Sequence, residues 1–195
     1  MAQLHLMDDR DLVHLYQSGD QSAINELIRR YKQKIFSTIY FLVRHREQAE
    51  DLFQEAFIKI INSLRKNHYN EQGKFLPWAL RIAHNLVIDH FRKEKLMPMQ
   101  RDTEEFSVVD VLPQRSRNAV EQIEYDEKIG MVRELLERLP YEQREVVILR
   151  HYAGLSFKEI SKMLNINLNT ALGRMHYAVL KMREMIEKEK IPLRE

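Results

Sequence analysis

Apolar residues recur at steps of three and four along most of this chain, a spacing that predicts α-helices rather than strands. The pattern predicts helices over Asp8–Ser18, from Asp20 through Leu42, over residues 49–64 and over 75–93. Gly19 ends the first of these helices, and Asp20 is placed to cap the second. We therefore expect a four-helix module within residues 1–95.

The helix over residues 49–64 has one face that is fully apolar and one that is polar except for a single isoleucine. On the polar face, Ile58 lies among Asp51, Gln54 and Glu55. An apolar spot with an acidic rim indicates a contact with another protein. Single exposed apolar residues are also common on solvated helices, so Ile58 taken alone is open to both interpretations.

The helix over residues 75–93 and the polar loop before it carry residues that suit a nucleic-acid surface. Arginine contacts phosphate, while asparagine and histidine can hydrogen-bond to base edges. Trp78 is either a core anchor or an aromatic that stacks on a base. The candidate DNA-binding residues here are Asn67, His68, Tyr69, Asn70, Arg81, His84, Asn85, Arg92 and Lys93.

Composition narrows the class of protein. The chain has 195 residues, enough for one or two small domains, and its five glycines and five prolines fit an all-helical fold. It has no cysteine, and no metal-ligand, catalytic or glycine-rich phosphate-binding pattern. We expect no catalytic site, metal or cofactor. Without a signal-peptide pattern or an apolar run of about 20 residues, we expect no membrane span and a cytoplasmic location.

Charge divides the chain into three parts. Residues 1–95 have a net charge of +3, residues 96–127 of −5 and residues 128–195 of +4. Helical periodicity is lost between Leu96 and Asn118, a stretch with two prolines and scattered acids. The fold predicted is all-α, with two small helical domains (1–95 and 119–195) joined by a flexible acidic linker (96–118). Two mildly basic blocks around an acidic connector fit two DNA-contacting modules, although such charges also occur in proteins that bind no nucleic acid.

The C-terminal part contains a helix-turn-helix pattern. Ser156 and Glu159 have the spacing of a capping box, and Asn167 is placed to cap the following helix. Gly173 costs about 1 kcal/mol relative to alanine inside a helix, so a close approach to another molecule would explain it. A plain helical hairpin with a solvated outer face is the alternative. The candidate DNA-binding residues of the second helix are Asn169, Thr170, Gly173, Arg174, His176, Tyr177, Lys181 and Arg183.

Three blocks of the chain resemble the sigma factors of bacterial RNA polymerase. DLFQEAFIKI (51–60) followed by PWALRIAHNLVIDHFRK (77–93) resembles sigma region 2 of the extracytoplasmic-function (ECF) group, and residues 139–184 are similar to region 4. Relatives usually have basic residues where this chain has Leu172, Tyr177 and Val179.

The resemblance implies a promoter-specificity subunit. Asp51, Gln54, Glu55 and Ile58 would dock on core RNA polymerase. The loop over residues 67–74 would capture an unpaired base of the minus-10 promoter element together with Asn85. The helix over residues 167–183 would enter the major groove of the minus-35 element. An anti-sigma protein that covers the same surfaces is a further expected partner.

Two other classes stay open on the sequence: an ordinary two-domain transcriptional regulator, and a helical interaction protein that binds no DNA. The 51–60 block argues against the regulator, because a regulator needs no acid-rimmed face for polymerase.

Overall fold

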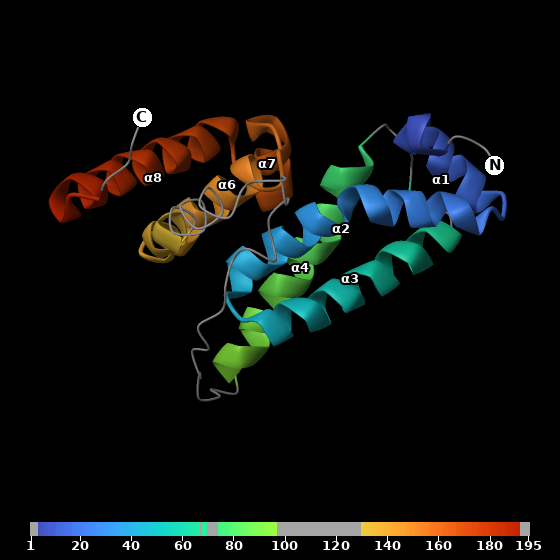
Figure 1. Ribbon diagram of the computed structural model, residues 1–195, viewed down its shortest axis with the longest axis horizontal. Helices are drawn as coiled ribbons and strands as arrows, with labels where there is room; N and C mark the ends of the chain where they lie inside the picture. Colours follow the sequence, from blue (N-terminus) through green and yellow to red (C-terminus); the bar gives the residue numbers. More distant parts are fainter. Residues whose placement is uncertain (1–3, 67, 70–73, 97–129, 192–195) are drawn as a thin grey trace, which may run out of the picture. The chain divides into compact units, whose positions relative to one another are not determined.

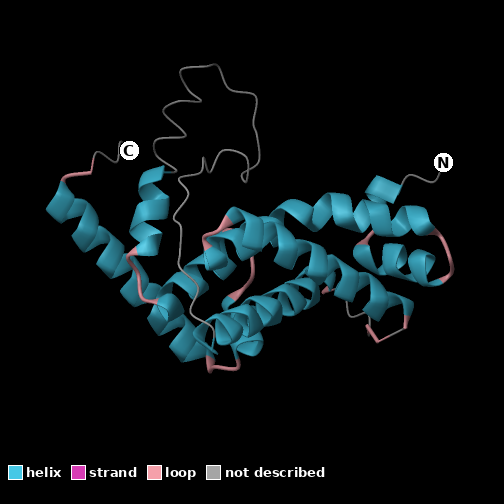
Figure 2. Ribbon diagram, turned by 90° about the horizontal axis from the view of Figure 1, so that it is seen from below, coloured by secondary structure: helices cyan, strands magenta, loops and turns pink. Residues whose placement is uncertain are grey.

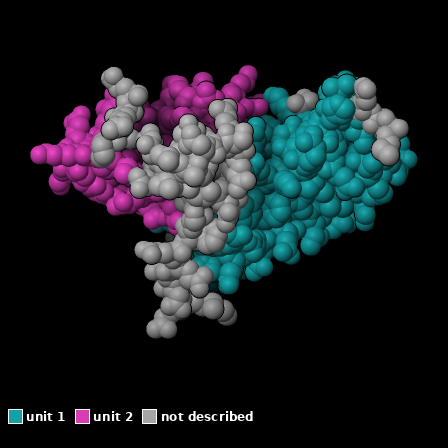
Figure 3. Space-filling view, viewed as in Figure 1, with its two compact units in different colours: residues 1–104 teal, residues 105–195 magenta. Residues whose placement is uncertain are grey.

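The computed structural model describes residues 4–66, 68–69, 74–96 and 130–191, and within them every regular element is a helix (Figure 2). The all-α prediction is confirmed. The chain divides into two compact units, Met1–Glu104 and Glu105–Glu195 (Figure 3). Nearly all of the predicted linker, residues 97–118, and the predicted start of the second domain at residue 119 lie outside the described residues.

The first unit is built around α2, which packs against each of the other helices (Figure 1). Its elements are a short 3-10 helix η1 (Leu4–Leu6), α1 (Asp9–Gln17), α2 (Gln21–Val43), α3 (Arg46–Arg65) and α4 (Phe75–Leu96). The predicted four-helix module is therefore present.

Local capping sets the turn between α1 and α2. The Asp20 carboxylate accepts a 2.8 Å hydrogen bond from the Ser22 amide, which confirms the predicted cap. Gly19 has a φ of +108°, a conformation that favours glycine. Asp8 caps α1 in the same way, with Asp11 N–H as donor at 2.8 Å.

A network of charged and polar groups fastens the N-terminal segment to α2. Asp9 accepts a 2.5 Å hydrogen bond from the Tyr31 hydroxyl and a 3.1 Å bond from Arg30. Arg30 also donates to the Leu4 carbonyl at 2.9 Å and to Glu26 at 2.9 Å. Burial, and then the hydrogen bond to Asp9, raise the pKa of Tyr31. The network therefore joins both η1 and α1 to α2.

We predict that the stability of the first unit falls in acid through Glu26. Hydrogen bonds from Arg29 and then Arg30 lower the pKa of Glu26 from 4.5 to about 2. A folded-state pKa below the unfolded value gives stability that is complete above pH 4.5 and is lost as the pH falls toward 2. Urea unfolding of Glu26→Gln and of the unchanged chain, measured from pH 2 to pH 7, tests this. A stability difference that does not shrink over that window would contradict the prediction.

The second unit has its own core. Its described helices are residues 130–137, α6 (Tyr141–His151), α7 (Phe157–Leu164) and α8 (Leu168–Glu189). α8 packs against both α6 and α7. The buried apolar cluster consists of Leu135, Leu136, Leu139, Val147, Ala178 and Met185. This core leaves the opposite side of α8 for other contacts.

Candidate protein and nucleic-acid interfaces

α3 separates an apolar side from an acidic one, as its periodicity predicts. Leu52, Ala56 and Ile60 are buried. Asp51, Gln54, Glu55 and Ile58 are exposed at i, i+3, i+4 and i+7, so they form one stripe, here called the acidic face.

Ile58 is the centre of this acidic face and one of the most exposed large apolar side chains of the described residues, at 59%. Glu55 is paired with Lys59 at 3.0 Å, but both side chains remain half exposed, so the pair adds little stability. The four exposed side chains of the acidic face are not part of the buried core of the first unit. The geometry fits a protein contact.

An aromatic cluster anchors the described part of the loop before α4. The Tyr69 ring lies 4.3 Å from Trp78 and 6.1 Å from Phe75, and Phe75 lies 5.6 Å from Tyr31 on α2. Tyr69 is 7% exposed, so its predicted place on the DNA-facing surface of the loop is wrong. Its ring packs within this aromatic cluster, and the neighbouring Trp78 is half-buried. His68 is exposed; Asn67 and Asn70 lie outside the described residues.

α4 presents a polar stripe that is narrower than the sequence suggests. Arg81, Asn85 and Arg92 are exposed at i, i+4 and i+11, and therefore share one face. His84 is buried, which corrects its predicted place on this stripe. It follows Leu80 by four residues and precedes Val87 by three, and both are fully buried, so the ring lies on the core side of the helix.

One further cation, Lys93, lies near this stripe, and Arg92 within it is paired. Lys93 is exposed one position beyond Arg92 and is therefore about 100° around the helix. Arg92 pairs with Asp89 at 3.3 Å, and its side chain remains 75% exposed. A pair this exposed leaves Arg92 able to contact phosphate.

Two caps hold the predicted helix-turn-helix. The Glu159 amide donates to Ser156 Oγ at 3.3 Å, and the Ser156 amide donates to the Glu159 carboxylate at 2.8 Å, which confirms the capping box. Asn165 ends α7 in the left-handed region at φ 54°. Asn167 accepts from the Thr170 amide at 2.7 Å and caps α8 as predicted.

Arg150, which was not identified from the periodicity, stabilises the turn that leads into the helix-turn-helix. Arg150 donates to the Leu155 carbonyl at 2.9 Å, and its guanidinium lies 5.3 Å from the Phe157 ring centre. These contacts join the end of α6 to the start of α7. Arg150 and Phe157 are seven positions apart in the sequence, so no local pattern identified this contact.

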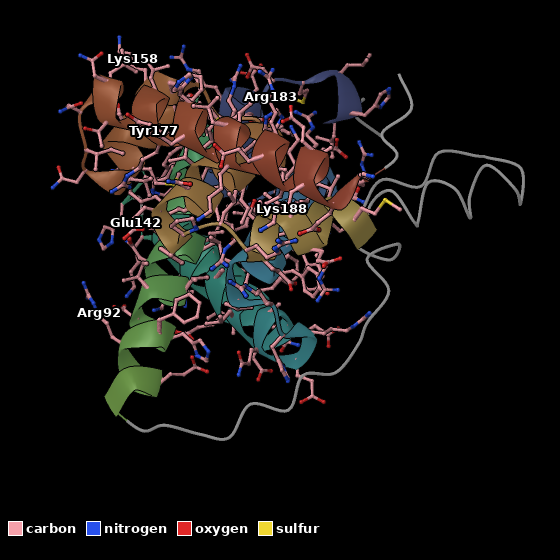
Figure 4. The ribbon with its side chains drawn as sticks, turned by 90° about the vertical axis from the view of Figure 1, so that its left-hand side faces the viewer. Arg92, Glu142, Lys158, Tyr177, Arg183 and Lys188 are labelled. Carbon is pink, nitrogen blue, oxygen red and sulfur yellow. The ribbon has the colours of Figure 1, made fainter. Side chains whose placement is uncertain are left out.

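The candidate residues of α8 fall on different sides of the helix. Asn169, His176 and Arg183 are exposed and related by steps of seven, so they share one side, with exposed Tyr177 beside them. Arg174 and Lys181 lie about 140–160° around the helix from His176. The structure therefore does not bring the three basic candidates, Arg174, Lys181 and Arg183, onto one side of the helix. Figure 4 labels Tyr177 and Arg183 on α8 and Lys158 on α7.

Thr170 and Gly173 are the two small candidate residues of α8. The Thr170 hydroxyl donates to Asn167 at 2.9 Å, so it belongs to the cap. A Cβ built on Gly173 would meet nothing of this chain within 4 Å. The space that this glycine leaves is open to a partner.

Within the described residues, no group of three or more acidic, histidine or cysteine side chains could hold a metal ion. None of the described helices combines the length and apolarity that crossing a membrane requires.

Comparison with known proteins identifies both units. The model of sigma-70 region 2 matches residues 27–96, and that of sigma-70 region 4 matches residues 129–182. The chain is 32% identical over 168 residues to the ECF RNA polymerase sigma factor SigW of Bacillus subtilis, covering 81% of this chain and 86% of that protein. It is 29% identical over 194 residues to the ECF sigma-E factor of Escherichia coli K12, covering 96% of each.

A third relative is longer than this chain. SigE of Mycolicibacterium smegmatis is 32% identical over 175 residues, which are 88% of this chain and 65% of that protein.

Solved structures share the fold. CnrH, in complex with the cytosolic domain of CnrY, has a TM-score of 0.66 at 20% identity, covering 92% of this chain and 97% of CnrH. RpoE of Bartonella quintana, in complex with the anti-sigma factor NepR, has a TM-score of 0.65 at 18% identity, covering 84% and 96%. With both conserved regions matched in order and an ECF relative covered over most of its length, the chain belongs to the ECF group of the sigma-70 family of bacterial RNA polymerase sigma factors.

Proposed function

We propose that this chain is a promoter-specificity subunit that binds core RNA polymerase, recognises the minus-10 and minus-35 elements and starts transcription, with no catalytic role of its own. One observation carries the proposal beyond family membership. The first unit presents two separate exposed surfaces, the acidic face of α3 and the Arg81–Asn85–Arg92 stripe of α4. A DNA-binding regulator needs only the second of these.

The predicted first domain, residues 1–95 within the first unit, would join polymerase and the minus-10 element. Asp51, Gln54, Glu55 and Ile58 supply an acid-rimmed apolar contact for the polymerase. Asn85 offers one donor and one acceptor to an unpaired base, with Arg81 and Arg92 on the neighbouring phosphates. Flipping a base out of the stack costs a few kcal/mol, which a shaped polar site can recover.

The predicted second domain, residues 119–195 within the second unit, would place α8 in the major groove of the minus-35 element. Asn169 and His176 face the base edges, and Arg183 contacts phosphate. Residues 96–118 would connect the two units. Since each unit binds a different part of one promoter, tethering by polymerase would make weak contacts by α8 sufficient.

RpoE of Bartonella quintana was solved in complex with the anti-sigma factor NepR, and CnrH with the cytosolic domain of CnrY. We extend this to the present chain as a proposal: an anti-sigma protein would hold it inactive in the cytoplasm by covering the acidic face or α8.

Reconstitution tests the proposed function directly. The full chain is mixed with core RNA polymerase and a library of genomic fragments, and the 5′ ends of the transcripts are mapped. We expect initiation from a defined set of fragments that share two spaced elements.

Filter binding of duplex DNA with and without core enzyme separates the alternatives. Tight, specific binding without core would favour an ordinary regulator, and no binding in either case would favour an interaction protein.

We predict that Gly173→Ala stabilises the second unit while it weakens promoter binding. Alanine gains about 0.5–1 kcal/mol over glycine inside a helix, and nothing of the chain obstructs the added methyl. If DNA approaches the backbone here, the methyl obstructs it. Urea unfolding and promoter binding by the reconstituted holoenzyme measure the two effects.

Gly130→Ala is the matched control, because Gly130 is also helical and its Cβ position is also open. It should leave promoter binding unchanged. Equal promoter affinity for both variants would remove the argument that Gly173 admits DNA.

A further inference from the structure

Exposed apolar side chains are concentrated on α8. The described residues include six large hydrophobic side chains that are exposed, and four of these lie on this one helix: Leu168 at 46%, Leu172 at 42%, Tyr177 at 62% and Leu180 at 39%. Leu168, Leu172, His176 and Leu180 are spaced by four residues, so they form a continuous line along the helix, here called the α8 ridge.

The α8 ridge is not part of the core of the second unit. α8 buries Ala171, Ala178 and Met185, and Met175, Met182 and Ile186 are partly buried against the same core, so the packing against α6 and α7 is made without the exposed leucines. An uncharged row of leucines in water gives up the stabilisation that burial would bring, about 25 cal/mol per Å² of apolar surface. Several large exposed apolar side chains on one helix make the ridge a candidate binding surface.

The neighbours of the α8 ridge favour duplex DNA as its partner. Asn169 precedes Leu172 by three residues and Arg183 follows it by eleven, so a base-reading amide and a cation share its side of the helix. The caps at Ser156 and Asn167 hold α8 as the second helix of a helix-turn-helix. In that motif, the N-terminal turns of the second helix contact base edges in the major groove.

Leucine can recognise only one group on those edges. A leucine side chain has no donor or acceptor, so it cannot pair with guanine, adenine or cytosine edges or with phosphate. Thymine alone presents a methyl group in the major groove. We propose that the α8 ridge, centred on Leu172, recognises thymine methyl groups of the upstream promoter element. This inference rests on the proposed function and names the kind of sequence that α8 selects.

The spacing of the ridge limits where those thymines lie. Leu172 and Leu180 are eight residues apart, about 12 Å along the helix axis. Base pairs are stacked about 3.4 Å apart. The thymines recognised should therefore fall within about four base pairs of each other, on either strand.

Replacing thymine by deoxyuracil tests the proposal, because it removes the methyl group and leaves base pairing intact. Holoenzyme made from the full chain and core polymerase first selects promoters from a library with a randomised upstream element. Each thymine of the selected element is then replaced in turn. At one or more positions we expect about a fourfold loss of affinity, the value of one buried methyl-sized group.

Leu172→Ala closes a double-mutant cycle. Holoenzyme with Leu172→Ala should bind the thymine duplex more weakly than holoenzyme with the unchanged chain. Replacing thymine by deoxyuracil at the position that Leu172 contacts should then cause no further loss of affinity. Leu6→Ala is the matched control, since Leu6 is a 70% exposed leucine in the first unit. Holoenzyme with this control should keep the full sensitivity to deoxyuracil.

Core binding and transcription are measured in the same samples. Normal transcription with no sensitivity to deoxyuracil at any position overturns the inference alone and assigns the α8 ridge to a protein partner. Selected elements that contain no thymine overturn it as well. If the chain fails to bind core polymerase, the proposed function fails, and this inference fails with it.

Discussion

Reversing Asp51 and Glu55 to lysine together with Ile58→Ala should weaken binding to core RNA polymerase at least tenfold, about 1.4 kcal/mol. The reversals replace attraction with repulsion at a basic partner surface, and the truncation removes the apolar centre of the contact. All three side chains are exposed on α3, away from the buried stripe of Leu52, Ala56 and Ile60, so the fold should remain. Fluorescence anisotropy of labelled chain with core enzyme measures the affinity, and circular dichroism confirms the fold.

A matched control variant shows whether the loss of core binding comes from the acidic face itself or from the change in net charge. Asp11→Lys, Asp89→Lys and Leu6→Ala, combined, make two reversals and one apolar truncation at exposed positions of the same unit. This variant should bind core polymerase like the unchanged chain. Equal losses in both triple variants would mean that net charge, not the acidic face, governs binding.

Local chemistry explains why much of the fold could be predicted from sequence. These caps join residues two or three positions apart, so Asp20, Ser156 and Asn167 could be identified without any tertiary information. The apolar period of α3 likewise identified both its buried stripe and its acidic face, because a helix turns by a constant angle per residue.

The wrong site predictions concern a residue whose side of the helix the hydrophobic period leaves ambiguous and a residue whose burial depends on tertiary contacts. His84 lies between the core stripe and the polar stripe of α4, and polarity alone assigned it to the wrong one. Tyr69 follows α3 in a segment without periodicity, and only its contacts with Phe75 and Trp78, made by the fold, explain its burial. The network that joins Asp9 to Tyr31 spans 22 positions and was likewise invisible to a local pattern.

The corrected α4 stripe concentrates the expected base contact on one residue. With His84 and Tyr69 buried, Asn85 is the central polar group between Arg81 and Arg92. Asn85→Ala should slow promoter opening by about fivefold or more, because a well-placed amide is worth about 1–3 kcal/mol of base discrimination. Core binding should be unchanged, since the acidic face lies on a different helix. Because Asn85 is exposed, the variant should melt at the temperature of the unchanged chain.

The dependence on one base distinguishes capture from a general loss. Permanganate footprinting on a set of promoters that differ at single positions of the minus-10 element should show Asn85→Ala insensitive to one base that the unchanged chain requires. Asn25→Ala is the control, an exposed asparagine on α2 that should keep both opening and preference. A uniform loss across all promoters would contradict base capture and would leave Asn85 a role in phosphate or backbone contact. A lowered melting temperature would instead place its amide in the structural framework of α4.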